Sequence, residues 1–477
     1  MIRMPTKTDI CIMGGGPAGC VLGSRLAQIG LDVCLVERTE FPRRHLGESL
    51  SPGVVPLLAS IGAGPAIEGA GYPRVRKVVV HWEAERERED PDGQGMLVDR
   101  GHFDQLLLDH ARDCGVRVLQ PATVEKLERH PSGWNVGIRA EGRLTELDAR
   151  MVTDASGRAG ALPRRRRRTG PPTLALHAYW TGKDLPDHPR IEAGADAWFW
   201  GVPLPDGVYN TLVFLDPRDL RAMRGPLTAR FHALIAASSL LPSGVKASLA
   251  GPIQAVDATP YLDAECVTDD SIKVGDAALA LDPISSSGVQ KAIQSALAAA
   301  AVVNTLLERP RARTLAQQFY RESLAGSSTR HRVWAGAQYA LGATNRTGRF
   351  WRERAAAATS LDVAPSRVEA TVLPEAPLQL APGVEIVEVP CVVDRFIEAR
   401  SAVRHPSMAA PVAYLGEVEL APLLGCVRSG MTSRDLVQSW MPRVSPRNGP
   451  TIARWLIARG LLVASADAPV TREGGGA

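Results

Sequence analysis

Three glycines near the start of the chain have the spacing of a phosphate-binding turn. Gly14, Gly16 and Gly19 follow the short apolar run 9–13 and open a helical pattern. The first glycine allows a tight turn, the second lets backbone amides approach a pyrophosphate, and the third permits close helix–strand packing. The helix N-terminus then offers unpaired N–H groups and a partial positive charge to phosphates.

An acidic residue limits the type of nucleotide. Glu37 ends a second apolar run, 33–36, and follows Gly16 by about twenty residues, where a carboxylate accepts hydrogen bonds from both ribose hydroxyls and disfavours a 2′-phosphate. Helices are predicted over 103–112 and over the alanine-rich stretch 289–307. Residues 8–38 predict a strand, a helix over 18–29 and a second strand. This unit suits FAD or NAD rather than NADP.

Composition sets limits on the rest of the molecule. A length of 477 residues predicts two or three domains, and a net charge of +4 is too small to indicate nucleic acid as the partner. The seven cysteines are scattered without a C-x-x-C spacing, which argues against a zinc site and for a reducing compartment. No metal is expected.

The N-terminal residues resemble a signal peptide in their basic and apolar content. A strand–turn–helix explains the same residues better, because the glycines fall at defined offsets. No other stretch reaches the roughly 20 apolar residues that span a bilayer. We therefore expect a cytoplasmic protein that does not contact a membrane.

Several separated motifs occur in a fixed order along two thirds of the chain, roughly residues 8–345. Besides the glycine turn and Glu37-Arg38, they are Arg44-His-Leu-Gly-Glu-Ser49, Val98-Asp-Arg100 with Phe103-Asp104, Asp154-Ala-Ser-Gly-Arg158, Gly275-Asp276, Asp282-Pro283 and Ser287-Gly288. With them the chain resembles the p-hydroxybenzoate-hydroxylase-like flavoproteins, in particular the branch of flavin-dependent halogenases and monooxygenases. The resemblance selects FAD as the cofactor.

The resemblance also implies roles for individual residues. Asp276 would contact the ribityl chain, the segment from Pro283 to Val289 would bring backbone amides towards the isoalloxazine ring, and Val124 would flank the adenine. A helix N-terminus at the flavin stabilises the anionic reduced ring. The full set of expected FAD-binding residues is Gly14, Gly16, Pro17, Ala18, Gly19, Glu37, Arg38, Arg44, Arg100, Val124, Asp276, Pro283, Gly288 and Val289.

Two tryptophans are the expected substrate residues. Trp198-Phe-Trp200-Gly-Val-Pro203 is similar to the W-x-W-x-I-P signature of flavin-dependent halogenases. On a strand, Trp198 and Trp200 share one face and can form the wall of a flat aromatic pocket, although core packing explains either ring equally well. Tryptophan halogenases carry a glutamate just after the proline near the flavin, where this chain has Ser285. That difference favours hydroxylation over halogenation.

An oxygenase must keep its activated oxygen dry, position the ring and stabilise developing charge. Glu48, His45 and Lys77 are the candidates for polar catalytic assistance, with Arg76 beside them. Lys77 is also the nearest counterpart of the halogenase lysine, and a solvent-facing strand cation is the simpler interpretation of it. His45 and Glu48 are equally explained as residues that order the flavin loop.

The expected fold is α/β. It comprises an FAD-binding Rossmann-like domain (1–170 with 265–345), an interleaved β-sheet substrate domain (71–99 and 171–264), a linker (346–381) and a C-terminal winged-helix-like domain (382–477). The five arginines of 164–168 indicate a solvated, mobile loop or, alternatively, a docking site for an acidic protein. The absence of a second glycine motif leaves NAD(P)H or a partner flavin reductase as the electron source.

The leading hypothesis is an FAD-dependent monooxygenase that hydroxylates an aromatic ring. Its most concrete form is a tryptophan side chain in a peptide or protein precursor, as in the maturation of the quinone cofactor of quinohaemoprotein amine dehydrogenase. A flavin-dependent halogenase, a reductase of prenyl chains and a non-catalytic flavin scaffold are the alternatives.

Overall fold

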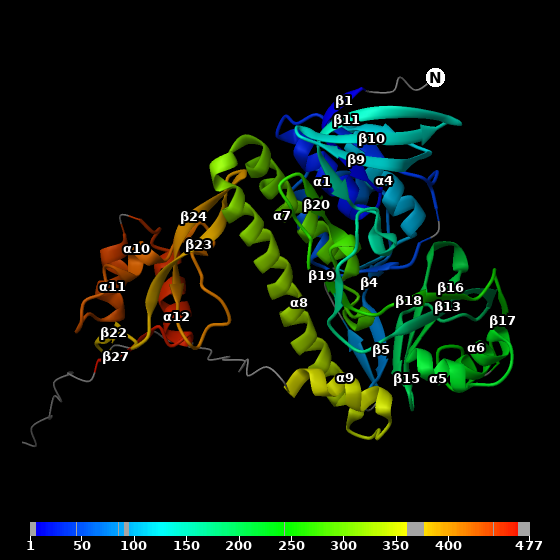
Figure 1. Cartoon of the computed structure of the whole chain (residues 1–477). Helices are drawn as coiled ribbons and strands as arrows, with labels where there is room; N and C mark the ends of the chain where they lie inside the picture. Colours follow the sequence, from blue (N-terminus) through cyan, green and yellow to red (C-terminus); the bar gives the residue numbers. More distant parts are fainter. Residues whose placement is uncertain are drawn as a thin grey trace, which may run out of the picture. The chain divides into compact units, whose positions relative to one another are not determined.

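The computed structural model describes residues 6–43, 45–83, 85–89, 95–242, 244–359, 376–441 and 443–465. The chain forms two compact units, residues 1–361 and 362–477, which are described separately (Figure 1). No described helix is long and apolar enough to cross a membrane.

The first sheet of unit 1 carries the predicted strand–helix–strand. Its strand order is β8-β2-β1-β11-β10-β9, and β20 pairs with β11. Strands β1, β2, β8, β11 and β20 run parallel, whereas β9 and β10 are antiparallel to their neighbours. Parallel strands covered on both faces are apolar throughout, and all four residues of β2 are buried. The strands are β1 (Lys7–Met13), β2 (Val33–Val36), β8 (Arg117–Leu119), β9 (Ala122–His130), β10 (Gly133–Ala140), β11 (Arg143–Asp154) and β20 (Ser271–Lys273).

Three helices pack beside this sheet. Helix α1 (Pro17–Gln28) contacts both α4 (Arg100–Asp113) and α7 (Gly288–Glu308). The helices expected at 18–29, 103–112 and 289–307 are thereby confirmed, with ends that differ by up to three residues. Shorter pieces complete this part: α2 (Val54–Ala59), α3 (Gly64–Gly69), and two three-stranded sheets formed by β3 (Ser49–Leu50), β7 (Gly95–Leu97) and β4 (Arg74–Val75), and by β12 (Arg166–Arg168), β19 (Tyr261–Asp263) and β21 (Leu279–Ala280).

The second sheet has the order β17-β13-β16-β15-β14-β5-β6, with β18 on β13. Its strands come from the two segments expected to form the substrate domain. They are β5 (Lys77–His81), β6 (Glu85–Glu89), β13 (Leu174–Lys183), β14 (Arg190–Ala193), β15 (Ala197–Pro203), β16 (Tyr209–Leu215), β17 (Lys246–Leu249) and β18 (Gln254–Asp257).

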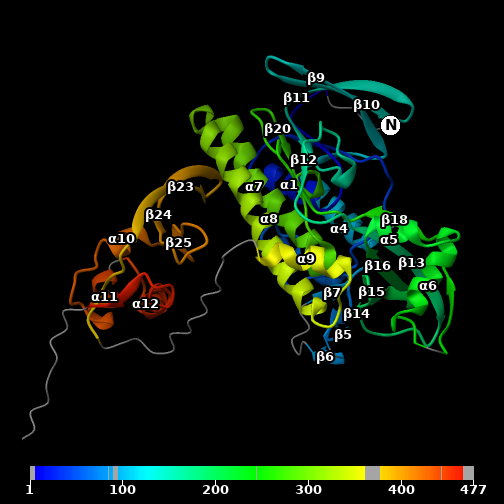
Figure 2. The same cartoon turned by 60° about the horizontal axis from the view of Figure 1, so that its bottom comes forward.

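The second sheet buries both of its faces. On one face it packs against α6 (Leu227–Ala236) and α5 (Pro217–Ala222). On the other it packs against α8 (Arg313–Ala343) and α9 (Arg349–Thr359), as Figure 2 shows. Side chains alternate between the faces, so Trp198 and Trp200 point to the α8–α9 side and Phe199 to the α6 side.

Two expectations about loops were wrong in part. Residues 166–168 of the arginine run form β12 and pair with β19, because the backbone hydrogen bonds of this segment are satisfied by a neighbouring strand. The linker expected at 346–381 contains helix α9 at its start. Phe350 and Trp351 are fully buried in the core beside α8, and this packing holds the helix in place. Residues 360–375 of that linker lie outside the described part of the chain.

Unit 2 folds around its own core. Helix α11 (Ser433–Trp440) begins at Thr432, which makes a capping box with Asp435. Trp440 is fully buried and donates to the Leu423 carbonyl at 3.0 Å. The other elements are β22 (Leu378–Leu380), the hairpin β23 (Glu385–Val393) and β24 (Phe396–Arg404), β25 (Tyr414–Leu415), β26 (Val418–Glu419), α10 (Ala421–Leu424), α12 (Asn448–Ala458) and β27 (Leu462–Ala464). The winged-helix assignment stays a prediction.

Candidate active site

The turn between β1 and α1 needs each of its three glycines for a different reason. Gly14 has φ +114°, and a Cβ there would lie 2.5 Å from the Ala155 carbonyl oxygen. A Cβ on Gly19 would lie 1.9 Å from the Gly14 carbonyl oxygen. A Cβ on Gly16 would meet only Arg43 Nη2, at 3.9 Å. Chain packing therefore fixes the first and third glycines, and Gly16 leaves space at the helix N-terminus that a pyrophosphate can fill.

The carboxylate of Glu37 is held at the edge of this turn. It is only 5% exposed; Oε2 accepts the Gly15 N–H at 2.7 Å and Oε1 accepts the Thr39 N–H at 2.9 Å. Each oxygen keeps a lone pair for a ribose hydroxyl. Arg38, beside it, is exposed, and Val124 on β9 is half-buried against the core of the first sheet.

Arg100 anchors the loop that precedes β3. Its guanidinium is buried and pairs with Asp104, with Nε 3.0 Å from Oδ1, while Nη1 donates to the Leu46 carbonyl at 2.5 Å. Asp104 also lies 3.6 Å from Arg43. Arg100 thus holds both ends of the loop that carries His45, which fits its expected support of the cofactor. Arg44 lies outside the described residues.

Asp276 follows β20 in the 3-10 helix η3 (Gly275–Ala277), and its side chain is 38% exposed. Oδ1 accepts from Lys291 Nζ at 2.6 Å, and Oδ2 lies 3.7 Å from Arg158 Nε. Desolvation raises the pKa of Asp276, but the charges of Lys291 and Arg158 outweigh it and hold the pKa below its ordinary value. The carboxylate is therefore ionised and partly open to a ligand.

The N-terminus of α7 is the second open helix end. The 3-10 helix η4 (Pro283–Ser285) precedes it, and Ser285 Oγ lies 2.6 Å from Ser287 Oγ. A Cβ on Gly288 would meet nothing within 4 Å, while Val289 is buried. With Gly16, this gives two helix N-termini with space beside a glycine, together with Glu37 and Asp276, the acids expected at the ribose and at the ribityl chain. These donors and spaces fit FAD.

Glu48 joins the flavin loop, which is the loop that precedes β3 and carries His45, to the second sheet. Its carboxylate is buried; Oε1 accepts from Tyr179 on β13 at 2.9 Å and from Asn210 on β16 at 3.1 Å, and Oε2 accepts the Gly47 N–H at 3.0 Å. Burial raises the pKa of Glu48, and these hydrogen bonds oppose the rise only in part. Desolvation and the charge of Arg100 lower the pKa of His45.

One face of the second sheet gathers aromatic and polar side chains. A cross-strand row runs Gln254, His177, Leu212, Trp200, Ile191 and Val80 through five pairs of strands. Trp200 is half-buried in a cluster that includes Leu46 of the flavin loop and Ile284 of η4. The row therefore lies against the loops expected at the flavin.

His177 is buried in this row. Among the described residues, neither of its ring nitrogens has a partner at hydrogen-bonding geometry. Desolvation lowers its pKa, and the side chain of Gln254 opposes that effect. The ring is therefore neutral at pH 7, with a donor and an acceptor available.

Trp198 belongs to the core rather than to an open wall. It is 2% exposed and stacks on Phe214 with ring centroids 3.9 Å apart and an interplanar angle of 11°. Trp82 packs on it edge-on at 6.4 Å. Of the two tryptophans predicted at the substrate, only Trp200 has a partly open side chain.

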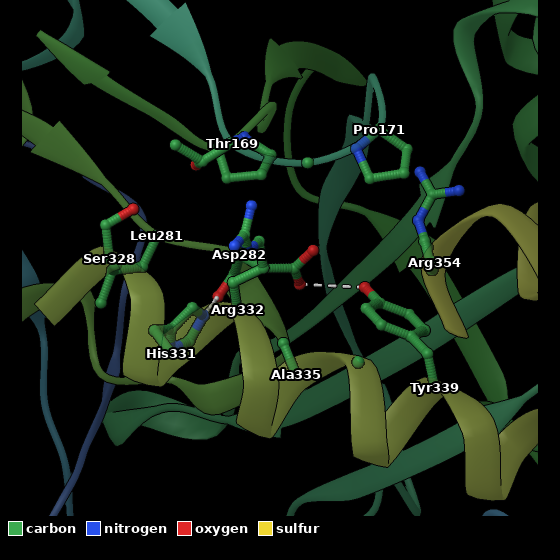
Figure 3. A pocket seen from close by; sticks show the side chains of 13 residues that line it. Thr169, Pro171, Leu281, Asp282, Ser328, His331, Arg332, Ala335, Tyr339 and Arg354 are labelled. Carbon is green, nitrogen blue, oxygen red and sulfur yellow. Dashed lines mark hydrogen bonds between the residues drawn. The ribbon is translucent and has the colours of Figure 1, made fainter. Parts of the chain in front are cut away.

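A small, mostly apolar chamber lies beside Asp282 (Figure 3). Asp282 Oδ1 accepts from the Tyr339 hydroxyl at 2.9 Å, and His331 Nε2 is 3.1 Å from the Asp282 carbonyl oxygen. The chamber measures about 30 Å³ for the centres of water-sized spheres, which suits a few waters and is too small for an indole ring. Burial raises the pKa of Asp282 and lowers that of His331.

The three catalytic candidates are not brought together. Lys77 begins β5, and its charge acts on Asp187, lowering that carboxyl's pKa after the larger effect of His188. Glu48 and His45 lie instead on the flavin loop. Among the described residues, no group of three or more His, Cys, Asp or Glu side chains is placed to hold a metal ion.

Four residues of the site escaped sequence reasoning. Tyr179, Asn210 and His177 lie on apolar strands. Only their alternation with residues of the opposite face, such as Ala178 on β13 and Tyr209 on β16, marks them as facing the other side of the sheet. Lys291 had a clearer signal, since it is a lysine inside an otherwise apolar and alanine-rich helix.

Comparisons with known proteins place this site in a family. An FAD binding domain model matches residues 7–169. Tryptophan 2-halogenase from Chondromyces crocatus is 29% identical, with 76% of this chain and 73% of that protein covered. The flavin-dependent halogenase armH4 of Armillaria mellea is 31% identical, covering 69% and 70%. The chain belongs to the flavin-dependent halogenase and monooxygenase family and is an FAD-dependent oxidoreductase.

Two solved structures are similar over nearly the whole chain. The peptidyl tryptophan dihydroxylase QhpG, essential for tryptophylquinone cofactor biogenesis, is 27% identical with a TM-score of 0.74, covering 96% of this chain and 100% of that one. The flavin-dependent halogenase CmlS is 21% identical with a TM-score of 0.75, covering 98% and 97%, and this likeness bears on the fold alone.

Proposed function

We propose that this protein hydroxylates an aromatic ring, and that the ring is a tryptophan side chain held in a polypeptide. The observation that carries the proposal is the likeness to a peptidyl tryptophan dihydroxylase across 96% of this chain, which includes the C-terminal unit. Trp200 on the second sheet supports it, because its partly open indole can contact a flat aromatic ring.

The overall reaction sets what the site must do. Ring C–H, O₂, NAD(P)H and a proton give ring C–OH, water and NAD(P)⁺. FAD, when bound, would carry the two electrons of NAD(P)H to O₂. NAD(P)H acts either directly or through a partner flavin reductase.

The chain's own residues bind, orient and exclude water. The two glycine-opened helix ends and Glu37 hold the cofactor. Glu48 fixes the flavin loop to Tyr179 and Asn210, so the ring on the sheet keeps its distance from the flavin. The buried cluster of Trp82, Trp198 and Phe214 excludes water from one side of the site.

Halogenation is the second candidate, because the relatives at 29% and 31% identity are halogenases. One feature of the site argues against it. Ser285 occupies the position where tryptophan halogenases carry a glutamate, and it pairs with Ser287.

The test supplies the protein with FAD, NADH, a flavin reductase and a panel of tryptophan-containing peptides, free tryptophan and phenol. We expect a peptide product that carries oxygen from ¹⁸O₂ and forms equally with and without bromide. A product that forms only with halide would establish the halogenase instead. No product and no substrate-dependent oxygen uptake from any panel member would overturn both.

A further inference from the structure

Lys291 is a buried cation in the first turn of α7 to which the proposed reaction assigns no role. Its side chain is 3% exposed, and Nζ donates to Asp276 Oδ1 at 2.6 Å and to the Leu279 carbonyl. The backbone N–H of Lys291 bonds to the Ser287 carbonyl at 2.9 Å, so the residue is part of the helix end that faces the flavin segment. The ammonium is fixed and shielded from solvent.

Asp276 connects this buried charge to the cofactor site. One oxygen is bound to Lys291, and the other lies 3.7 Å from Arg158 Nε. The position of Asp276 is fixed further by Tyr261, whose hydroxyl donates to its backbone carbonyl at 2.6 Å. The Asp276 side chain stays 38% exposed, so part of its carboxylate is open to a ligand.

The charges of the groups around Asp276 do not cancel. Asp276 contributes one negative charge, while Lys291 and Arg158 contribute one positive charge each, and His45 is held neutral by its lowered pKa. The N-terminal dipole of α7 adds further positive potential. A fixed positive field in a poorly solvated site favours the anionic reduced form of a flavin over the neutral oxidised form.

We propose that Lys291 is a positioning residue that sets the reduction potential of the bound FAD. Its ammonium holds the Asp276 carboxylate in place. The group formed by Asp276, Lys291 and Arg158 then carries one net positive charge. This inference requires FAD binding, which the family establishes, and does not depend on which ring is oxidised.

A second buried lysine offers a matched control. Lys273 and Asp263 also form a pair, with Nζ 2.8 Å from Oδ1, and both side chains are almost fully buried. Lys273 Nζ donates in addition to the Pro163 carbonyl at 2.7 Å. Asp263 has no exposed oxygen to offer a ligand, so this pair is a structural one.

The experiment measures the two-electron midpoint potential of the FAD-loaded protein against a reference dye, together with FAD affinity by flavin fluorescence. For Lys291→Met we expect the preference for reduced over oxidised FAD to fall about tenfold, which is about 30 mV for a two-electron couple. Lys291→Arg should stay near the wild type. Lys273→Met should lower the melting temperature and leave the potential unchanged.

A double variant protects the test against a variant that fails to fold. Lys291→Met with Asp276→Asn carries the same net charge as the wild type, so its potential should return towards the wild-type value. Lys291→Gln, which keeps a hydrogen-bond donor, should match the Met variant. An unchanged potential in Lys291→Met and Lys291→Gln, or an equal shift in Lys273→Met, would overturn the proposal and leave the monooxygenase assignment untouched.

Discussion

The glycine turn and the substrate face of the second sheet are assembled in opposite ways. The turn takes its three glycines from six consecutive residues, and Glu37 follows on the next strand. The face takes one side chain from each of six strands, from Val80 on β5 to Gln254 on β18. A locally built site depends on single backbone positions, whereas a site built by strand register depends on packing across the sheet. We therefore expect single substitutions in the turn to have large effects on folding or FAD binding. Single substitutions on the sheet face should lower stability and activity only in part.

The largest effect is expected at Gly19. An alanine Cβ there would collide with the Gly14 carbonyl at 1.9 Å, so Gly19→Ala should give no folded, FAD-binding protein. Gly16→Ala is the matched variant, because its Cβ enters open space. It should unfold in urea like the wild type but bind FAD about tenfold or more weakly. A Gly16→Ala protein that binds FAD as tightly as the wild type in a titration would contradict the assignment of this space to the pyrophosphate.

The two tryptophans of β15 separate packing from binding. Trp198→Ala removes a fully packed ring and should cost about 3–5 kcal/mol of unfolding free energy. Trp200→Ala, from a half-buried position on the same face, should cost less than about 2 kcal/mol and should raise KM for the aromatic substrate. Urea denaturation and steady-state kinetics measure the two effects. Equal loss of stability in both variants would show that Trp200 is core as well.

Removing a hydrogen bond between the flavin loop and the second sheet should have an intermediate effect on stability and activity. Tyr179→Phe leaves buried Glu48 without one donor and should cost about 1–3 kcal/mol of unfolding free energy. It should also lower kcat/KM by about tenfold, because the loop loses its attachment to the substrate face. The control is Tyr320→Phe, which removes a buried hydroxyl that donates to the Lys273 carbonyl at 2.6 Å. Loss of activity in proportion to stability in both variants would remove the special role of Tyr179.

The smallest effect is a pH dependence that Glu48 imposes on stability. Its pKa is raised above the ordinary 4.5, so in the window between the two values the native state binds more protons than the unfolded state. This contribution is present below pH 4.5 and is lost as pH rises through the folded pKa. Glu48→Gln lacks it, so the variant should gain melting temperature relative to the wild type between about pH 4 and about pH 8. A constant difference across that range would contradict the shifted carboxyl.

Much of the cofactor site was predictable, because the roles of its residues are local. A strand, a turn with glycines at fixed offsets and a helix form wherever those residues occur together, and the structure has them at β1 and α1. The alanine-rich sequence of α7 predicted a helix equally well. The helix α9 was missed because its alanine-rich sequence lies next to a loop-like stretch, and Phe350 and Trp351 stabilise it only through contacts with α8.

The arginine run of 164–168 is a second segment whose structure the sequence did not predict. Five consecutive arginines indicate solvation, but Arg166 lies over the Tyr261 ring with Cζ 4.3 Å from its centroid, and the segment pairs with β19. Nothing in the run itself predicts the partner strand, which lies about a hundred residues later.

By itself the sequence determined that the chain binds FAD and belongs to a flavin-dependent oxidoreductase family, since hydrogen-bonding backbone and one acid at fixed spacing suffice for a nucleotide. Only the tertiary structure decided which side chains share the substrate face, that Glu48 meets Tyr179 and Asn210, and that Lys291 lies buried on Asp276. Glu48 lies more than a hundred residues from Tyr179 and Asn210, and Lys291 lies 15 residues from Asp276. The register of a sheet and the packing of α7 on η3, rather than local spacing, bring them together.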